Sequence, residues 1–334
     1  MATPAADDDP SGTVGEPAPD DSRSGGVEEE VTARVGWRYT LSQIKTDPTA
    51  LVGLGIIVFM TAVAIVSAVD YYLLDYWFAS TFWYHPGNDP GTVTRLLPPV
   101  GFENLYGPGT WAHPLGTDHR GRDILVRLFY GTRIAMTVGF LATAIGLVGG
   151  TIIGAVSGYY GGWIDDVLMR AVETIYAIPF LVLVIAFMTA FGRDLTYAMV
   201  GVGIASIPTF ARLIRSRVVS VREEDYVEAA RAAGVRDSAI ILRHVIPNSF
   251  APVLVQATLQ IGVAILIVAG LSFLGFGAQP PTPSWGQMLS ASRNYMLPDP
   301  WFSVWPGIAI LVTVVGFNLF GDGLRDALDP RIQN

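Results

Sequence analysis

The sequence predicts an all-α integral membrane protein with six transmembrane helices, and three observations lead to that prediction. Hydrophobic residues make up 51% of the 334 residues and charged residues only 15%, whereas a soluble domain carries about a quarter charged residues. Uncharged windows long enough to cross a hydrocarbon core of about 30 Å recur along the chain. Glycine and proline lie inside these windows, and such residues are tolerated in bilayer helices.

The chain begins with an acidic tail. Residues 1–30 carry nine acidic residues and one arginine, a balance of −8 that equals the net charge of the whole chain. The tail is rich in proline, glycine and serine and has almost no apolar side chains, so we expect it to be disordered. The segment 31–49 combines basic and aromatic residues, and we expect it to lie on the cytoplasmic surface of the membrane.

The first two expected spans are separated by a long external loop. The first span occupies 50–69, between Asp47 and Asp70, and the loop follows at 70–133. The second span begins at Ile134, and its glycines at four-residue spacing favour close helix packing. Four further windows complete the set, at 174–191 with Pro179, 195–211 with Pro208, 251–276 and 301–320. Residues 134–334 are therefore expected to form a five-helix core.

The distribution of arginine and lysine predicts the orientation. With a cytoplasmic N-terminus, thirteen such residues near the helix ends lie inside and seven outside, which agrees with the positive-inside rule. We expect both termini in the cytoplasm, in a multi-pass protein of the cytoplasmic membrane.

The most informative segment joins the fourth and fifth spans. Acidic residues at 223–225 and Arg231 suit the two ends of a helix dipole, alanines give the helix a small-residue face, and Gly234 is placed to end it. A second short helix is expected at 238–244, capped by Asp237 and stopped by Pro247. We call residues 222–247 the elbow. Its small outer face suits insertion into a groove on another protein, although an ordinary solvated loop is the plain alternative.

The elbow resembles the EAA loop of ATP-binding-cassette (ABC) importer permeases. The resemblance rests on Glu228-Ala-Ala-x-x-x-Gly234 and on the ending His244-x-x-Pro247, which is similar to the branch that imports dipeptides, oligopeptides and nickel. Stretches elsewhere agree, and the similarity covers about residues 31–334. The stretches that agree with this branch are 113–118 with 121–123, 158–166, 272–277 with 280–286, and 321–330. His119 and Arg120 depart from that pattern, which more often has an acidic and an aliphatic residue.

The resemblance implies a C-type permease subunit with the type I importer fold, whose coupling loop at 215–249 docks on an ATPase. The implied coupling residues are Asp225, Tyr226, Glu228, Ala229, Ala230, Gly234, His244 and Pro247. The implied partners are a homologous B-type permease, two ATPase subunits, an external substrate-binding protein and the lipid bilayer, and no nucleic acid. Dipeptides or oligopeptides are the implied substrates, with nickel complexes and oligosaccharides as alternatives.

The residues themselves argue against catalysis by this chain. A phosphate-binding loop requires a lysine after a glycine-rich run, and the single lysine, Lys45, lacks that context. We therefore expect no cofactor here, with ATP and magnesium bound by the partner ATPases, and no enzyme activity. His113, Asp118, His119 and Asp123 match no metal-ligand spacing. We expect Asp118, Arg122 and Asp123 to cap and pair at the start of the second span, or to meet the external partner.

Two other functional classes remain open from the residues alone. An ion-coupled transporter or channel would show inverted repeats and paired charges within the membrane, and we find neither. A membrane enzyme would need a cluster of acid, base and nucleophile, and none is evident in the sequence.

Overall fold

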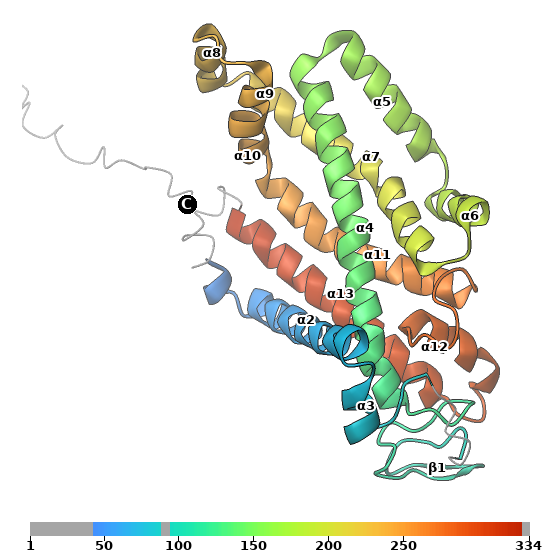
Figure 1. The fold of residues 1–334 in the computed structure, drawn as a ribbon. Helices are drawn as coiled ribbons and strands as arrows, with labels where there is room; N and C mark the ends of the chain where they lie inside the picture. Colours follow the sequence, from blue (N-terminus) through green and yellow to red (C-terminus); the bar gives the residue numbers. More distant parts are fainter. Residues whose placement is uncertain (1–42, 88–93, 329–334) are drawn as a thin grey trace, which may run out of the picture.

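The computed structural model describes residues 43–87 and 94–328, which fold mainly into helices (Figure 1). The acidic tail and most of the segment expected at 31–49 lie outside the described residues. Within them, five helices are long and apolar enough to span a membrane, and one bent pair provides a sixth candidate. The five are α2 (Pro48–Leu73), α4 (Ile124–Tyr160), α7 (Leu195–Arg222), α11 (Ala251–Phe273) and α13 (Trp301–Leu328), and the bent pair is α5 (Gly162–Ala177) with α6 (Phe180–Phe191).

Helix α2 begins where the sequence places a cap. The carboxylate of Asp47 accepts a 2.9 Å hydrogen bond from the amide of Thr49, and Pro48 occupies the first turn, where a missing amide hydrogen is harmless. The helix packs closely on α13, because a Cβ atom at Gly53 would lie 2.6 Å from the backbone nitrogen of Phe320. Glycine is required at this crossing.

Helix α4 begins at Ile124, ten residues before the expected start of the second span. Asp123 caps it by accepting from the amide of Val126 at 2.8 Å. The apolar window missed this first part because it contains two arginines, which are buried by contacts with distant segments. Arg127 donates to the carbonyl oxygen of Pro86 at 2.6 Å, and the guanidinium of Arg133 lies 3.6 Å from the ring centroid of Tyr71.

The expected third span is wrong as a continuous helix. Residues 174–191 are divided between α5 and α6, which meet at an angle of 90°. Ile178 and Pro179 form the break, since a proline disfavours helical conformation in the residue before it. Helix α7 is also longer than its window and continues through Pro208 to Arg222, α11 ends at Phe273 rather than 276, and α13 extends to Leu328 rather than 320.

A glycine stripe joins α4 to α7, as the four-residue spacing predicted. A Cβ atom at Gly150 would lie 2.4 Å from Cβ of Phe210, and one at Gly154 would lie 2.4 Å from the carbonyl oxygen of Ala211. No side chain larger than hydrogen fits at either place without moving the helices apart.

The segment expected as an external loop contains its own small elements. They are α3 (Trp77–Phe82) and an antiparallel hairpin of β1 (Glu103–Asn104) and β2 (Gly107–Pro108). Between α11 and α13 lie α12 (Trp285–Ser292) and a 3₁₀ turn, η3 (Arg293–Tyr295). Figure 1 shows α3, the hairpin and α12 at one end of the molecule and α8 to α10 at the opposite end.

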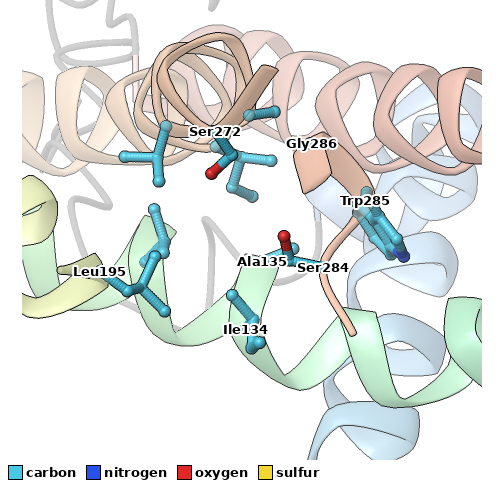
Figure 2. Close-up of a pocket in the computed structure, with 11 residues that line it drawn as sticks. Ile134, Ala135, Leu195, Ser272, Ser284, Trp285 and Gly286 are labelled. Atoms are coloured by element: carbon cyan, nitrogen blue, oxygen red, sulfur yellow. The ribbon is translucent and has the colours of Figure 1, made fainter. Parts of the chain in front are cut away.

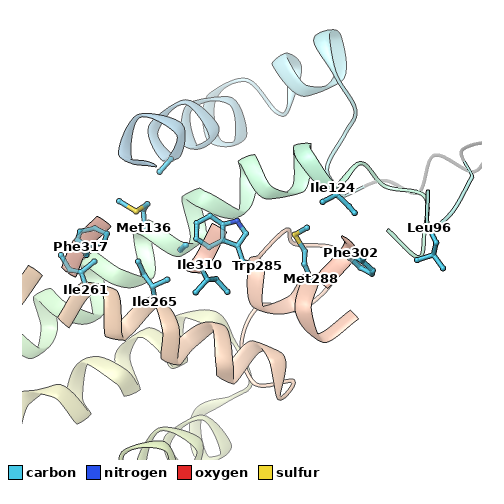
Figure 3. Close-up of a cluster of buried hydrophobic side chains, with 12 residues drawn as sticks. Leu96, Ile124, Met136, Ile261, Ile265, Trp285, Met288, Phe302, Ile310 and Phe317 are labelled. Atoms are coloured by element: carbon cyan, nitrogen blue, oxygen red, sulfur yellow. The ribbon is translucent and has the colours of Figure 1, made fainter. Parts of the chain in front are cut away.

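One apolar cluster unites the spanning helices with α12 and with Leu96 of the segment before α4 (Figure 3). Met136 of α4, Ile265 of α11 and Phe317 of α13 meet within the bundle, and Trp285 and Met288 of α12 continue the cluster outward. The indole nitrogen of Trp285 donates to the carbonyl oxygen of Leu128 at 3.0 Å, which anchors α12 on α4.

Candidate functional site

The elbow continues directly from α7. Helix α8 (Asp225–Ala232) follows after Glu223 and Glu224, and Asp225 lies in its first turn and Arg231 in its last, as the helix dipole favours. Gly234 ends it with a φ of +76°, a conformation in which glycine carries no strain. These features confirm the predicted helix and its glycine terminator.

The second half of the elbow differs from the prediction. It is one continuous helical segment made of α9 (Asp237–Ile240), a π-helical turn η2 (Ile241–Val245) and α10 (Ile246–Ser249). Pro247 does not stop it, because it lies in the first turn of α10, where no amide hydrogen is needed. Side chains satisfy neighbouring carbonyl oxygens, with Asn248 donating to that of His244 at 2.6 Å and Ser249 to that of Val245 at 2.8 Å.

Apolar residues fasten the elbow to the spanning helices. Val227 of α8 is fully buried and packs in one cluster with Ile214 and Val218 of α7 and with Ile240 and Val245 of the second half. Because both halves share this cluster, the elbow is held as a unit against the end of α7.

Polar contacts fasten the elbow to the last turn of α4. Asp237 does not cap α9, and its carboxylate instead accepts a 2.8 Å hydrogen bond from the hydroxyl of Tyr159. Arg222 donates to the carbonyl oxygens of Gly158 and Tyr159, each at 3.2 Å, where the helix dipole favours a cation. The guanidinium of Arg231 lies 5.5 Å from the Tyr159 ring centroid, and its hydrogen bond with the Tyr159 hydroxyl raises the pKa of Arg231.

The elbow residues named in the sequence fall into two groups. Asp225, Tyr226, Glu228, Ala229, Gly234 and Pro247 are exposed, whereas Ala230 and His244 are half-buried. Tyr226 and His244 come together across the elbow with their ring centroids 6.5 Å apart, and burial raises the pKa of the Tyr226 hydroxyl. Tyr226 and Ala229 of α8 and Ala233, the residue that caps its C-terminal end, share one exposed side at three- and four-residue spacing.

Sequence reasoning missed the supporting residues Tyr159 and Arg222. A groove of about 680 Å³ lies between the end of α4 and the elbow, and both residues line it. The stretch 158–166 was singled out for its similarity to known permeases, but nothing in its spacing indicated a contact with Asp237.

Of the four residues weighed as an external metal site, His113, Asp118 and Asp123 are committed to other contacts. Asp123 pairs with His113 at 2.8 Å, and Asp118 pairs with Arg122 at 2.7 Å, all four being buried. This confirms the expected capping and pairing at the start of the second span. No group of three or more metal-ligating side chains is present in residues 43–87 and 94–328.

A small crevice within the bundle is apolar (Figure 2). Ile134 and Ala135 of α4, Leu195 of α7 and Trp285 of α12 contribute to its lining. Its volume is about 20 Å³, which is space for little more than one water molecule. It is no substrate site in this conformation.

Comparison with known proteins decides the family. Residues 150–334, which include the whole elbow, match the model of the binding-protein-dependent transport system inner membrane component family. The chain is 42% identical over 307 residues to the dipeptide transport system permease protein DppC of Alkalihalophilus pseudofirmus, covering 92% of this chain and 94% of the relative. The chain belongs to this family. It is therefore a multi-pass component of the inner membrane.

Other members and a solved structure agree. Identity to the glutathione transport system permease protein GsiD of Pectobacterium atrosepticum is 43% over 247 residues, covering 72% of this chain and 82% of the relative. Identity to the dipeptide transport system permease protein DppC of Haemophilus influenzae is 39% over 300 residues, covering 89% of this chain and 94% of the relative. An inward-facing structure of the MetNI methionine ABC transporter has the same fold in one chain, with a TM-score of 0.52 at 17% identity over 62% of this permease and 98% of that chain.

Proposed function

We propose that this permease is the C-type membrane subunit of an ATP-driven importer of dipeptides or oligopeptides, and that the elbow transmits force from a separate ATPase. The relatives that span most of the chain are named as dipeptide and glutathione permeases, which favours peptides over nickel complexes or oligosaccharides. A B-type permease, two ATPases that bind ATP and magnesium, and an external binding protein complete the proposed importer.

The observation that carries this proposal is the two-sided character of α8. Val227 on one side is fully buried against α7, whereas Tyr226 and Ala229 on the other side are exposed. An exposed face of small side chains beside one aromatic ring is suited to lie in a groove of a partner. Because α8 is held by both α7 and α4, a push on that face is transmitted to two spanning helices.

Each named elbow residue has a place in this proposal. Tyr226, Ala229 and the exposed acids Asp225 and Glu228 would contact the ATPase directly. Ala230 and His244 would hold the halves of the elbow together from their half-buried positions. Gly234 and Pro247 would set the chain direction between the halves and toward α11.

The topology that suits this role has six spans with both termini in the cytoplasm, counting α5 and α6 as one span. An even number of crossings places both ends of the chain on one side. In support, Ile44 and Ala50 near the start of α2 pack against Leu324 near the end of α13. Leu254, which follows the elbow in α11, packs on the same cluster, so the elbow lies on the side of both helix ends.

Substitution of Ala229 by tryptophan tests the proposal. The bulky ring would prevent α8 from entering a groove, so the purified complex should lose its ATPase subunits and ATP-dependent peptide uptake should fall at least about tenfold. Ala112→Trp places the same side chain on an exposed site at the opposite end of the molecule, and it should retain the ATPases.

Two results would contradict the proposal. One is full ATPase recovery and uptake with Ala229→Trp in a normally folded protein. The other is a purified wild-type chain that forms only homo-oligomers and whose uptake survives ATP depletion but stops with an uncoupler, as in an ion-coupled transporter.

A further inference from the structure

A second cavity, of about 240 Å³, lies at the end of the molecule opposite the elbow. Its lining residues come from the turn that precedes α4, from the end of α11 with the following segment 275–280, and from α12. Figure 1 shows α12 at the end of the molecule opposite α8. No acidic residue lines it, and its polar lining comes from His119, Arg120, Arg122, Ser272, Gln279, Gln287 and Ser290. No residue of the elbow lines this cavity.

Arg122 gives the cavity an unused buried donor. Its side chain is only 2% exposed, and its Nε and Nη2 atoms are both held by one oxygen of Asp118 at 2.7 Å. The remaining nitrogen, Nη1, is buried and has no hydrogen-bond partner within the described residues. A buried donor of this kind is unfavourable unless a ligand accepts from it.

The charges around the cavity are unbalanced toward positive. Arg120 lines it, and Arg127 lies just behind it, with its Nε atom 3.7 Å from the Asp118 carboxylate. Asp118 is therefore shared by the guanidinium groups of Arg122 and Arg127. Asp123 is engaged by His113 at 2.8 Å, so among the described residues no carboxylate is left for Arg120 at the cavity. An anion in the cavity would restore the balance.

Neighbouring groups are arranged to donate as well. Arg127 donates from Nη2 to the amide oxygen of Gln287 at 2.9 Å, which leaves the amide nitrogen of Gln287 as the donor for another partner. His119 is stacked between Tyr295 and Phe302, with centroid distances of 5.5 and 5.8 Å. Burial lowers the pKa of His119, so the ring is neutral near pH 7 and offers one N–H group.

We propose that this cavity binds the terminal carboxylate of a short peptide on the external face of the permease, an inference that rests on the proposed import of peptides. The free Nη1 donor of Arg122, with Arg120 and the amide donor of Gln287 beside it, suits a carboxylate, whose two oxygens accept charge-assisted hydrogen bonds. The volume is below that of pockets that enclose drug-sized ligands, so the cavity takes the end group of a peptide and leaves the remainder outside. The site would favour free-acid peptides over their amides.

Chemical modification of Arg120 tests this proposal directly. Arg120 is exposed and should react with phenylglyoxal, and mass spectrometry of the purified importer without its binding protein measures the rate. Alanyl-alanine and acetate should slow the reaction about tenfold, and alanyl-alanine amide should not. Arg95, an exposed arginine of the same external segment, should react equally fast under all conditions.

Two variants check that the cavity causes the protection. Arg122→Lys keeps the charge opposite Asp118 but removes the free Nη1 donor, and Gln287→Glu places a carboxylate on the cavity wall. Each should abolish the protection of Arg120 by alanyl-alanine while leaving the reaction of Arg95 unchanged.

Three outcomes would overturn the proposal: equal protection by the free acid and the amide, equal protection of Arg95, or protection that appears only when the binding protein is added without peptide. The last outcome would assign the cavity to an acidic side chain of the binding protein. The proposed import function is tested separately, because absence of ATP-dependent peptide uptake by the reconstituted wild type would contradict it while the protection experiment still decides the cavity.

Discussion

The hydroxyl of Tyr159 donates a 2.8 Å hydrogen bond to the carboxylate of Asp237, and this bond joins the end of a spanning helix to the elbow. The two residues are 78 positions apart in the sequence. Arg222 reinforces the junction from α7 through the carbonyl oxygens of the last turn of α4. A displacement of the elbow is therefore carried to α4 by directed contacts as well as by the apolar cluster.

Removal of the Tyr159 hydroxyl should weaken coupling more than it weakens the fold. Tyr159→Phe keeps the ring but loses the bond to Asp237, a change worth about 1 kcal/mol. We expect fewer peptides transported per ATP hydrolysed, with a nearly unchanged melting temperature. Parallel assays of uptake and ATP hydrolysis in proteoliposomes measure this ratio.

Tyr160→Phe provides the matched control for that ratio. Tyr160 lines the same groove, but within the described residues its hydroxyl makes no hydrogen bond to the elbow, so loss of that hydroxyl should leave the ratio intact. Equal effects of the two substitutions would show that the Tyr159–Asp237 bond has no special role.

The glycine stripe makes a prediction about stability. In Gly154→Ala the new methyl group would lie 2.4 Å from the carbonyl oxygen of Ala211, so α4 and α7 must separate. We expect a loss of roughly 1–3 kcal/mol in the free energy of unfolding, seen as a lower midpoint of thermal unfolding in detergent. Gly55→Ala in α2 meets no atom within 4 Å and should leave the midpoint unchanged or raise it. If both substitutions behave alike, close packing does not explain the stripe.

The ion pair between α5 and α7 should couple these helices energetically. The Nε atom of Arg215 donates to the carboxylate of Asp165 at 2.6 Å, and Ser157 of α4 donates to the same carboxylate. A double-mutant cycle of Asp165→Ala and Arg215→Ala should give an interaction of about 1 kcal/mol, because the pair is charged but partly exposed. Simple additivity of the two single changes would mean that the pair contributes nothing to the junction.

The spans were predictable from the sequence as far as local composition determines them. Within the described residues, uncharged windows located the five long apolar helices and part of the bent pair α5 and α6, because the thickness of the bilayer sets a minimum apolar length. The beginning of α4 was not predictable in this way, since Arg127 is buried through partners supplied by Pro86 and Gln287, which are distant in sequence. The 90° bend at Pro179 was also hidden, because a hydropathy window contains no information on direction.

The same distinction applies to the elbow. Gly234 was predictable as a terminator from its position after a helical pattern, which is a local property of the chain. The role of Asp237 was not, because its carboxylate is at the start of a helix in the sequence and could have capped it. Tyr159 lies close enough to donate a hydrogen bond to that carboxylate only in the folded chain, and this bond replaces the expected cap.

One buried acid near the start of α13 should make stability depend on pH. Asp299 lies just before α13 and is fully buried. Burial raises the pKa of its carboxyl group to about 6, and the backbone amide of Trp301 offsets only part of this shift. The folded state therefore binds this proton more tightly than the unfolded chain, whose carboxyl group has the usual value of 3.8.

The sign of the effect follows from that order of pKa values. Between about pH 4 and pH 6 the folded protein holds the proton that the unfolded chain has lost, so the free energy of unfolding falls as the pH rises through this window. Above pH 6 the buried carboxylate is charged and the loss is complete, on the order of 3 kcal/mol for a pKa raised from 3.8 to about 6. Asp299→Asn removes the charge at every pH, so its melting temperature should exceed that of the wild type at pH 8 and approach it at pH 5. Glu103→Gln, at an exposed carboxylate of the hairpin, should show no such difference, and an equal gain for Asp299→Asn at both pH values would mean that the carboxylate is not what destabilises the fold.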